Sequence, residues 1–353
     1  MKVNLRTFGT AVVAACLLTA CTSGAESDQS SSGGGSAAPQ GQGAAGSGDC
    51  SEDVEDVTVG LVAVNLNSPS IARIADNFER AAEERGWTVE VFDGQGDQNA
   101  TNNAAENLLQ RGVDLLVNNS SPNDQMGPVI QAAEAAGVPF VSIYGGAAPG
   151  VDAEIGTNET VNGSLITQEM VNRLEDGSRV LKLNWTVLQA LRDRDAGFHA
   201  VMDEAKNVEI AREIEVKVPG QVDDAYAQIT NFLQADKDID AIWLGWDELA
   251  PPAVRAVQEA GLEDEIIIVG FDGNPFAWDL IRSGSPYIME PANPFEPMGE
   301  QAVTTANCLL QGGELESNVI YMKPCLITRE TVPAEGEFPN WDDCAYFPGQ
   351  IGS

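Results

Sequence analysis

The 353-residue sequence is poor in the groups that carry much acid–base and metal chemistry. It has a single histidine, His199, and its six cysteines form no CxxC pair. One histidine argues against a Ser-His-Asp triad unless His199 itself serves, and the missing CxxC pairs argue against a structural zinc site. No GxxxxGK stretch is present to form the common phosphate-binding loop.

Positive charge is also scarce. Lysine and arginine number 19 against 54 aspartates and glutamates, and the formal net charge is −35. Nucleic acid and anionic membrane surfaces would repel such a chain, so neither is an expected partner. The acidity says nothing positive about a ligand, because most surface charges serve only solvation.

The first 21 residues, MKVNLRTFGTAVVAACLLTAC, place Lys2 and Arg6 ahead of an apolar stretch that is too short for a membrane span. This is the pattern of a secretory signal, and Leu18 to Cys21 resemble a bacterial lipobox. The resemblance implies a lipoprotein signal peptide at 1–20, lipidation of Cys21 and a lipid anchor at the outer face of the cell membrane. An ordinary signal peptide with an incidental cysteine is the alternative.

Residues 21–49 contain almost no bulky apolar groups. Such a segment cannot bury enough surface to offset its ordering entropy, so we expect a flexible tether. The 304 residues from Cys50 onward exceed the size of one usual core, which favours two lobes.

Four cysteines remain beyond the signal and the lipid site: Cys50, Cys308, Cys325 and Cys344. An even number in an exported chain indicates two disulfides, with three possible connectivities. We favour Cys308 with Cys325, on a helix and the following strand, and Cys50 with Cys344, which would join the two ends of the folded region.

From residue 57 onward, buried strands alternate with amphipathic helices. VTVGLVAV (57–64) precedes a helix from about Ser70, and Gly86 ends that helix before the strand WTVEVFD. A second series has strands near 179–185, 208–216, 241–246 and 266–271. Continuous apolar strands between helices predict an α/β fold with two doubly wound parallel-sheet lobes. Ligands bind at the carboxyl ends of such strands, where Asp272 of IIIVGFDG lies.

The chain resembles type I periplasmic sugar-binding proteins of the ribose-binding kind, the solute-binding components of ABC importers. The resemblance covers about 57–332 and rests on seven phrases in register: GVDLLVNNSSPND, AAGVPFVSI, IGTNETVNGSLITQEMV, LRDRDAGFHAVM, WLGWDELAPPAVRAV, IIIVGFDGNPF and YIMEPANPFEPMGEQAV. It implies a three-segment hinge near 156–159, 290–293 and 323–327. The implied N-terminal lobe is 50–157 with 292–324, and the implied C-terminal lobe is 158–291 with 325–353.

The resemblance also implies binding residues. Asp272 matches the sugar-binding aspartate of the family, whose carboxylate accepts hydrogen bonds from adjacent hydroxyls; capping of the next helix is the alternative. Arg192 in LRDRDAGF matches the family's arginine; a surface pair with Asp195 is the alternative. Asn65 and Asn67 follow the first strand, where the family has polar contacts and aromatic residues, but NLNSPSI has no aromatic residue.

Three further positions depart from the family pattern. Tyr144 and Gly145 replace an Asp-Arg pair, Trp246 replaces an asparagine, and Glu290 replaces a hinge glutamine. With Trp185, the aromatic residues at strand ends suit the C–H face of a sugar ring. Glu290 could instead cap the helix near Phe295.

These observations predict an extracytoplasmic binding protein for a neutral sugar or polyol, or alternatively an amino-bearing or cationic solute. The expected protein is a monomer, partners an ABC permease and needs no cofactor or metal. A glycosidase that uses Asp272 and Glu290 is the enzyme alternative. A sensor that presents its closed form to a receptor is another, whereas a repressor would need a DNA-binding module at the N-terminus.

Overall fold

The computed structural model describes residue 50 and residues 52–344. The predicted signal peptide (1–20), the predicted lipidation residue Cys21, the tether and the last nine residues of the predicted C-terminal lobe lie outside the described residues. Within the described part of the chain, no helix combines the length and the apolar character needed to span a membrane.

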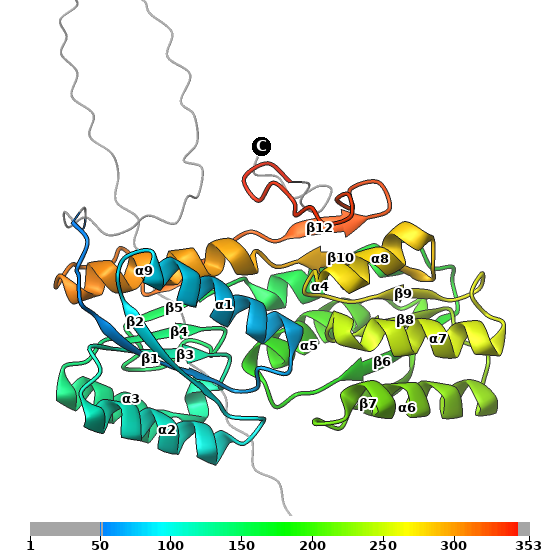
Figure 1. The fold of residues 1–353 in the computed structure, drawn as a ribbon. Helices are drawn as coiled ribbons and strands as arrows, with labels where there is room; N and C mark the ends of the chain where they lie inside the picture. The colour runs from blue at the N-terminus through cyan, green and yellow to red at the C-terminus, as the bar shows by residue number, and fades with distance from the viewer. Residues whose placement is uncertain (1–49, 51, 345–353) are drawn as a thin grey trace, which may run out of the picture. The chain divides into compact units, whose positions relative to one another are not determined.

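The first lobe is built on a six-stranded sheet with the strand order β11-β5-β4-β3-β1-β2 (Figure 1). Its strands are β1 (Thr58–Ala63), β2 (Thr88–Asp93), β3 (Leu115–Asn119), β4 (Phe140–Ile143), β5 (Ala153–Gly156) and β11 (Val319–Tyr321). All neighbouring strands in this sheet are parallel. Its helices are α1 (Pro69–Glu83), α2 (Gln98–Arg111), α3 (Gly127–Ala136) and α9 (Phe295–Leu310).

Along these strands, the side chains of alternate residues are buried on opposite faces of the first sheet. Leu61, Val117 and Ile143 pack with α1 and α9. Val62 and Leu116 pack with α2 and α3 on the other face. Both faces of a parallel sheet are therefore covered, which explains why its strands read as continuous apolar runs.

The second lobe repeats this design with the strand order β12-β10-β9-β8-β6-β7. Its strands are β6 (Ser178–Asn184), β7 (Val208–Glu215), β8 (Ala241–Leu244), β9 (Ile267–Val269), β10 (Tyr287–Ala292) and β12 (Cys325–Thr328). Helices α4 (Glu159–Val171) and α5 (Gln189–Met202) cover one face. Helices α6 (Gln221–Ala235), α7 (Ala250–Ala260) and α8 (Pro275–Ser283) cover the other. The predicted fold class is confirmed, with one addition: β12 pairs antiparallel to β10 at the sheet edge.

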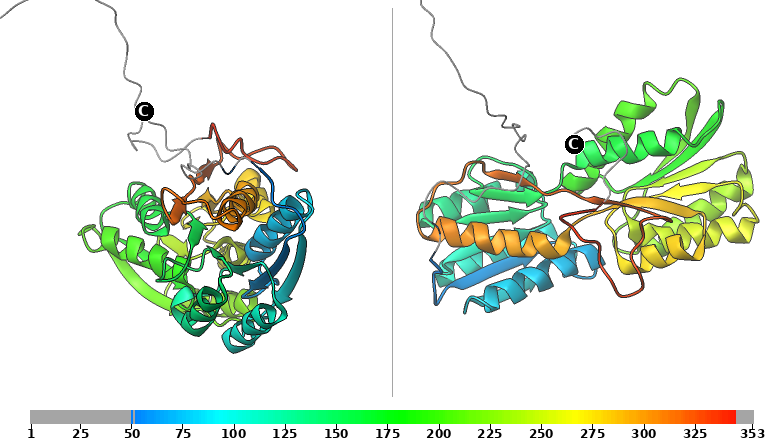
Figure 2. Two further views of the ribbon diagram at one scale, coloured as in Figure 1. Left: turned by 90° about the vertical axis from the view of Figure 1, so that its left-hand side faces the viewer. Right: turned by 90° about the horizontal axis from the view of Figure 1, so that it is seen from above.

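Three connections join the two sheets (Figure 2). They run from β5 to α4, from β10 to α9 and from β11 to β12. Thr157 lies in the first connection and Asn293 in the second, and the Thr157 Oγ1 donates to the Asn293 Oδ1 at 3.2 Å. Two of the three connections are thus hydrogen-bonded to each other.

Close packing of α4 against α5 depends on two glycines. A Cβ on Gly163 would lie 2.3 Å from the Arg194 carbonyl oxygen, and one on Gly197 would lie 2.3 Å from the Thr160 carbonyl oxygen. Real side chains do not tolerate such distances, so both positions require glycine. This approach brings Arg194 of α5 to Glu159 at the start of α4.

The disulfide pairing differs from the one favoured by the sequence. Cys50 is bonded to Cys308 and Cys325 to Cys344. The predicted pairing is wrong because Cys308 lies on α9 in the first lobe, whereas Cys325 lies on β12 in the second. Cys50 enters beside α9, where the Val54 amide donates to the Asn307 Oδ1 at 2.9 Å.

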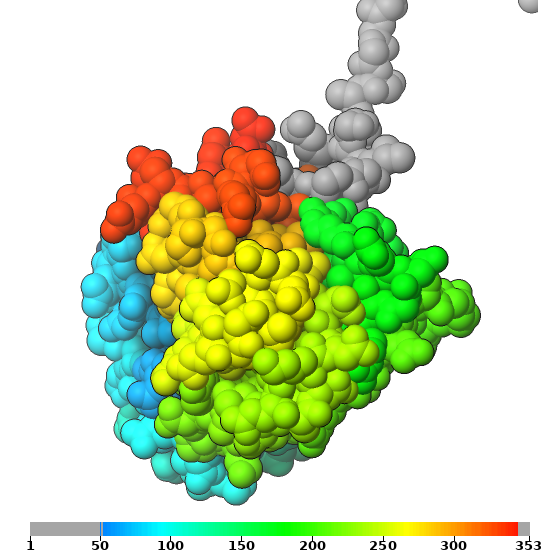
Figure 3. All heavy atoms as spheres, turned by 90° about the vertical axis from the view of Figure 1, so that its right-hand side faces the viewer, coloured from blue at the N-terminus to red at the C-terminus, as the bar shows by residue number. Residues whose placement is uncertain are grey.

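The segment after β12 is held against the second lobe (Figure 3, red). The Cys325–Cys344 disulfide closes this segment, and Phe338 packs edge-on against Trp278 of α8 with ring centroids 5.7 Å apart. The same Phe338 ring lies 5.3 Å from the Arg73 guanidinium carbon of α1. Phe338 therefore contacts residues of both lobes.

Candidate functional site

A cavity opens between the carboxyl ends of the two sheets. It holds about 740 Å³ of empty space, counting the part that is open to solvent. The first lobe contributes Val64, Asn65, Ser68, Ser70, Ile71, Ile74, Ser120, Tyr144 and Phe295. The second lobe contributes Trp185, Leu188, Ala190, Leu191, Arg194, Val218, Gln221, Trp246, Glu248 and Asp272.

Three residues at strand ends line this cavity with left-handed backbone. Ser120 follows β3 with φ 68°, Tyr144 follows β4 with φ 60°, and Asp272 lies shortly after β9 with φ 99°. Such φ values are unfavourable for residues with a side chain and concentrate where function demands them. Five non-glycine residues of the described chain have positive φ, and three of them line the cavity. This coincidence marks the cavity as the candidate functional site.

Arg194 forms the charged floor of the cavity. Its Nε and Nη2 donate to the two carboxylate oxygens of Glu159 at 2.8 and 3.1 Å, and its Nη2 also lies 2.7 Å from the Asp272 Oδ1. Its Nη1 donates to the Gly245 carbonyl at 2.8 Å. Burial alone would lower the pKa of Arg194, but the carboxylates of Asp272 and Glu159 raise it, so the guanidinium is held as a cation.

Asp272 joins this floor to the first lobe. Its Oδ2 accepts a 2.9 Å hydrogen bond from the Ser70 hydroxyl at the start of α1, and Ser70 accepts one from Asn274. Helix α8 begins after Asn274, and no side chain caps it. The alternative role of Asp272 as a helix cap is therefore wrong, and its carboxylate keeps lone pairs free to accept hydrogen bonds from a ligand.

Hydrogen bonds link the floor to the connections between the lobes. The Tyr144 hydroxyl and the Thr157 hydroxyl are 2.8 Å apart. Thr157 donates to Glu159 at 2.6 Å, and Asn293 donates to the same carboxylate at 3.2 Å. Burial raises the pKa of Tyr144 well above its usual value, so its phenol stays neutral. The cavity floor is thus hydrogen-bonded to two of the three connections between the lobes.

Arg192, the arginine predicted to bind the ligand, does not line the cavity. It is partly exposed and bonds to the Val187 carbonyl, to Gln189 and, at 3.0 Å, to Asp124 of the first lobe. The surface alternative, a pair with Asp195, is also wrong. Residues two apart on a helix face nearly opposite directions, so Arg194 occupies the position assigned to Arg192.

The other predicted residues are divided. Tyr144, Trp185, Trp246, Asp272 and Asn65 line the cavity, as expected for ligand contacts. Asn67 instead lines a neighbouring surface hollow, where its amide bonds to the Asn65 Oδ1.

Glu290 lies behind the cavity and does not line it. It is fully buried in β10, and the Tyr287 hydroxyl donates to its Oε2 at 2.8 Å. It does not cap α9, whose first turn has no side-chain cap. Burial, and then the nearby Asp247 carboxyl, raises the pKa of Glu290 well above its usual range. The acid pair needed for a glycosidase is therefore not presented to one cavity.

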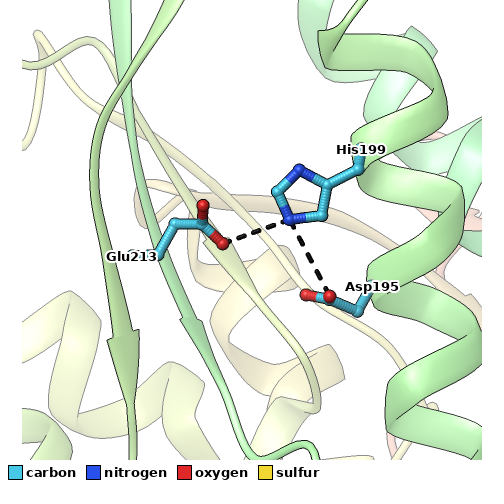
Figure 4. Close-up of side chains that lie close together, drawn as sticks. All are labelled: Asp195, His199 and Glu213. Carbon is cyan, nitrogen blue, oxygen red and sulfur yellow. Dashed lines mark hydrogen bonds and ion pairs between the residues drawn. The ribbon is translucent and has the colours of Figure 1, made fainter.

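A second charged cluster lies on the other side of α5, outside the cavity. Asp195, His199 and Glu213 place three possible metal ligands within 4.8 Å of one another (Figure 4). The Lys182 ammonium lies among them, in contact with both carboxylates and 3.1 Å from the His199 Nε2. The lysine already supplies the cation that such a cluster attracts, so these residues carry no metal assignment.

The residues missed by sequence reasoning include Arg194, Ser70 and Glu248. A signal for Arg194 was present, because it lies on the helix face of Leu191 and Phe198, both buried. Ser70 and Glu248 give no such signal, since serine and glutamate are common on any surface.

Two α/β lobes that enclose a cavity define a two-lobed binding protein, and comparison with known proteins agrees. A family model described as a periplasmic binding protein domain matches residues 59–314. The ribose import binding protein RbsB of Bacillus subtilis is 27% identical over 268 residues, 75% of this chain and 85% of that protein. RbsB of Escherichia coli is 26% identical over 264 residues, 74% of this chain and 87% of that protein.

Solved structures agree on the fold. An ABC sugar transporter subunit from Rhodobacter sphaeroides superposes with a TM-score of 0.74 at 23% identity, covering 78% of this chain and 99% of that one. The chain belongs to the periplasmic binding protein domain family. The two RbsB relatives are binding proteins for ribose import.

Proposed function

We propose that the protein captures a small neutral sugar or polyol in the cavity and delivers it to an ABC permease. The observation that carries this proposal is the buried Arg194–Asp272 pair, which faces a cavity walled by both lobes. A carboxylate accepts hydrogen bonds from adjacent hydroxyls, and aromatic rings of Tyr144, Trp185 and Trp246 suit the C–H face of a sugar. The ribose import function of the two RbsB relatives supports the same class of ligand.

The mechanism is an equilibrium between open and closed lobes. We assign 50–157 with 292–324 to one moving body and 158–291 with 325–353 to the other. A ligand that bonds to Asp272 in one lobe and to Ser70 or Ser120 in the other favours the closed form, because it gains contacts there that the open form lacks. The closed surface is what the permease would recognise.

A thermal-shift screen over pentoses, hexoses, polyols, amino sugars and nucleosides tests the ligand class. A ligand that binds only the folded protein raises its melting temperature with concentration. We expect a neutral sugar or polyol to do so, and Asp272→Ala to abolish the shift. Stabilisation by amino-bearing compounds alone would favour the cationic alternative.

The lipid anchor is part of the same proposal. We expect metabolic labelling with a radioactive fatty acid to mark the wild-type chain and not Cys21→Ser. The variant should be released into the medium with its sugar binding intact. A labelled Cys21→Ser chain, or a wild-type chain released in full, would contradict the anchor.

The permease partnership needs its own test. An ABC permease and ATPase from the same organism, reconstituted in liposomes, should hydrolyse ATP faster when the sugar-loaded protein is added. A receptor kinase that responds instead, with no effect on the transporter, would favour the sensor alternative.

A further inference from the structure

The wall of the cavity is more apolar than a fully hydroxylated sugar requires. The lining includes three aromatic residues at strand ends, Tyr144, Trp185 and Trp246. It also includes further aliphatic and aromatic side chains from both lobes: Val64, Ile71, Ile74, Leu188, Leu191, Val218 and Phe295.

The polar groups of the lining fall into three sets. Asn65, Ser68 and Ser120 lie on the first-lobe wall. Ser70, Arg194 and Asp272 form an inner set, joined by hydrogen bonds and an ion pair. Gln221 and Glu248 belong to an outer set that also lines the neighbouring surface hollow. The aliphatic side chains make up most of the remaining wall.

The outer set is largely occupied by its own contacts. Gln221 donates to the Glu248 Oε1 at 2.9 Å, and the Trp246 indole donates to the Glu248 Oε2 at 3.3 Å. Burial raises the pKa of the Glu248 carboxyl, which further weakens it as a charged acceptor.

The inner set offers few free positions. Arg194 uses four of its five N–H groups, on Glu159 twice, on Gly245 and on Asp272. What remains is one guanidinium N–H and the free lone pairs of Asp272. These suffice for two or three hydroxyls at one end of a ligand, and Asn65, Ser68 and Ser120 can bond hydroxyls that face the first lobe. A hydroxyl directed at Ile71, Leu188, Leu191 or Val218 would instead be buried against aliphatic carbon without a partner.

We propose, on the basis of the proposed function, that the ligand is an amphipathic sugar or polyol. Its hydroxyls contact Asp272 and Arg194, and a deoxy carbon, alkyl or thioalkyl group lies against Ile71, Leu188, Leu191 and Val218. The substituent contributes binding through burial of apolar surface, at about fourfold in affinity for each buried CH₂.

Matched pairs of sugars test this proposal by isothermal titration calorimetry on the soluble mature chain. The pairs are D-ribose with 5-deoxy-D-ribose and 5-methylthio-D-ribose, D-galactose with D-fucose, and methyl with isopropyl β-D-galactoside. We expect the more apolar member of at least one pair to bind tenfold or more tightly than its parent.

The possible outcomes separate the two proposals. Binding of the parent sugars as tight as, or tighter than, their apolar partners in every pair would overturn this inference and leave the proposed function intact. Binding of no compound from these pairs or from the wider screen would overturn both.

A wall variant gives an independent readout. Ile71→Thr keeps the side-chain branching but places a hydroxyl in the wall, so the preference for the apolar member should fall by three- to tenfold. Val187→Thr is the matched control and should leave the affinities for both members of each pair within twofold, because Val187 is exposed and does not line the cavity. An unchanged preference in a folded Ile71→Thr chain would count against the proposed wall contact.

Discussion

Helix α5 lies between two clusters of charged side chains. Both clusters combine carboxylates with a cation, but they differ in burial and in the elements that they join. The cleft cluster, Glu159, Arg194 and Asp272, is almost fully buried, and Asp272 carries it into contact with Ser70 of the first lobe. The strand-edge cluster, Lys182, Asp195, His199 and Glu213, joins α5 to β6 and β7 within the second lobe. Its two carboxylates and its histidine are partly exposed.

The comparison teaches that a gathering of acids and bases does not by itself identify a site. The strand-edge cluster contains its own cation, the Lys182 ammonium, and within the described residues its charged groups contact no residue of the cavity lining. The cleft cluster faces a cavity, includes a residue with strained backbone and is bonded to two connections between the lobes. A functional site is distinguished from a cluster of surface charges by buried charged groups, strained backbone and side chains that converge from separate elements.

The largest expected difference follows from removing the cation of each cluster. Arg194→Met leaves Glu159 and Asp272 buried without a cationic partner, which should lower the free energy of unfolding by about 3–5 kcal/mol and abolish sugar binding. Lys182→Met leaves carboxylates that water can reach, so we expect less than half that loss and binding within twofold. Chemical denaturation and calorimetry measure both quantities.

If Arg194→Met does not fold, Arg194→Lys retains the charge and should fold with binding weakened at least tenfold, because lysine cannot reproduce the forked hydrogen bonds. Equal loss of binding in the Lys182 and Arg194 variants would remove the distinction between the two clusters.

A smaller effect is expected from neutralising one acid of each cluster. Asp272→Asn keeps the shape but removes a charged acceptor, which should weaken sugar binding by about 10- to 100-fold. Asp195→Asn is the control and should leave binding within twofold. A fluorescence titration that uses Trp185 and Trp246 as cavity probes provides the measurement, and similar affinities for the two variants would argue against Asp272 as a ligand contact.

Glu290, which is buried behind the cavity, should make the free energy of unfolding depend on pH. Burial raises the pKa of Glu290 in the folded chain above its ordinary value of 4.5, which we take for the unfolded chain. At pH values between these two pKa values, the carboxyl is ionised in the unfolded chain and protonated in the folded chain. The stability contributed at this residue is therefore lost as pH rises above about 4.5, by up to about 1.4 kcal/mol per pH unit.

Glu290→Gln removes this loss, so the variant should become progressively more stable relative to wild type as pH rises. Urea denaturation at several pH values checks the trend. Asp236→Asn provides a contrast of opposite sign at lower pH. The hydrogen bond from Arg179 lowers the pKa of Asp236 below 3.8, so the stability contributed by Asp236 is present above that pH and is lost as pH falls below it. Parallel pH profiles for wild type and Glu290→Gln would contradict the prediction.

The smallest effect is expected at Arg192. Its exposed contacts predict that Arg192→Ala changes the free energy of unfolding by no more than about 0.5 kcal/mol and sugar affinity by less than twofold. Calorimetry on Arg192→Ala and Arg194→Met measures the sugar affinities of both variants, and so compares two arginines of the same helix. A tenfold loss of affinity in Arg192→Ala would restore the ligand contact first predicted for this residue.

Much of the fold was predictable because its signals are local. Apolar strands between amphipathic helices indicate two parallel sheets, and the position of Asp272 after a buried strand predicts its place at a ligand-binding edge. The choice between Arg192 and Arg194 was accessible from helical spacing, since only Arg194 shares a face with Leu191 and Phe198. The disulfide pairing was accessible as well, because the implied lobes already place Cys50 with Cys308 and Cys325 with Cys344. The hydrogen bonds of Ser70 to Asp272 and Asn274 were not, because they depend on how the two lobes meet, a long-range fact of packing.

The left-handed backbone at Ser120, Tyr144 and Asp272 constrains how this chain can be evolved or engineered. Glycine would adopt each of these φ values at lower cost, so libraries selected only for thermal tolerance should drift toward glycine there. Each such gain would erase a wall or an acceptor that faces the solute. At these three residues, substitutions that raise thermal stability would therefore weaken solute binding. A screen for thermostable variants needs retention of binding as a second criterion.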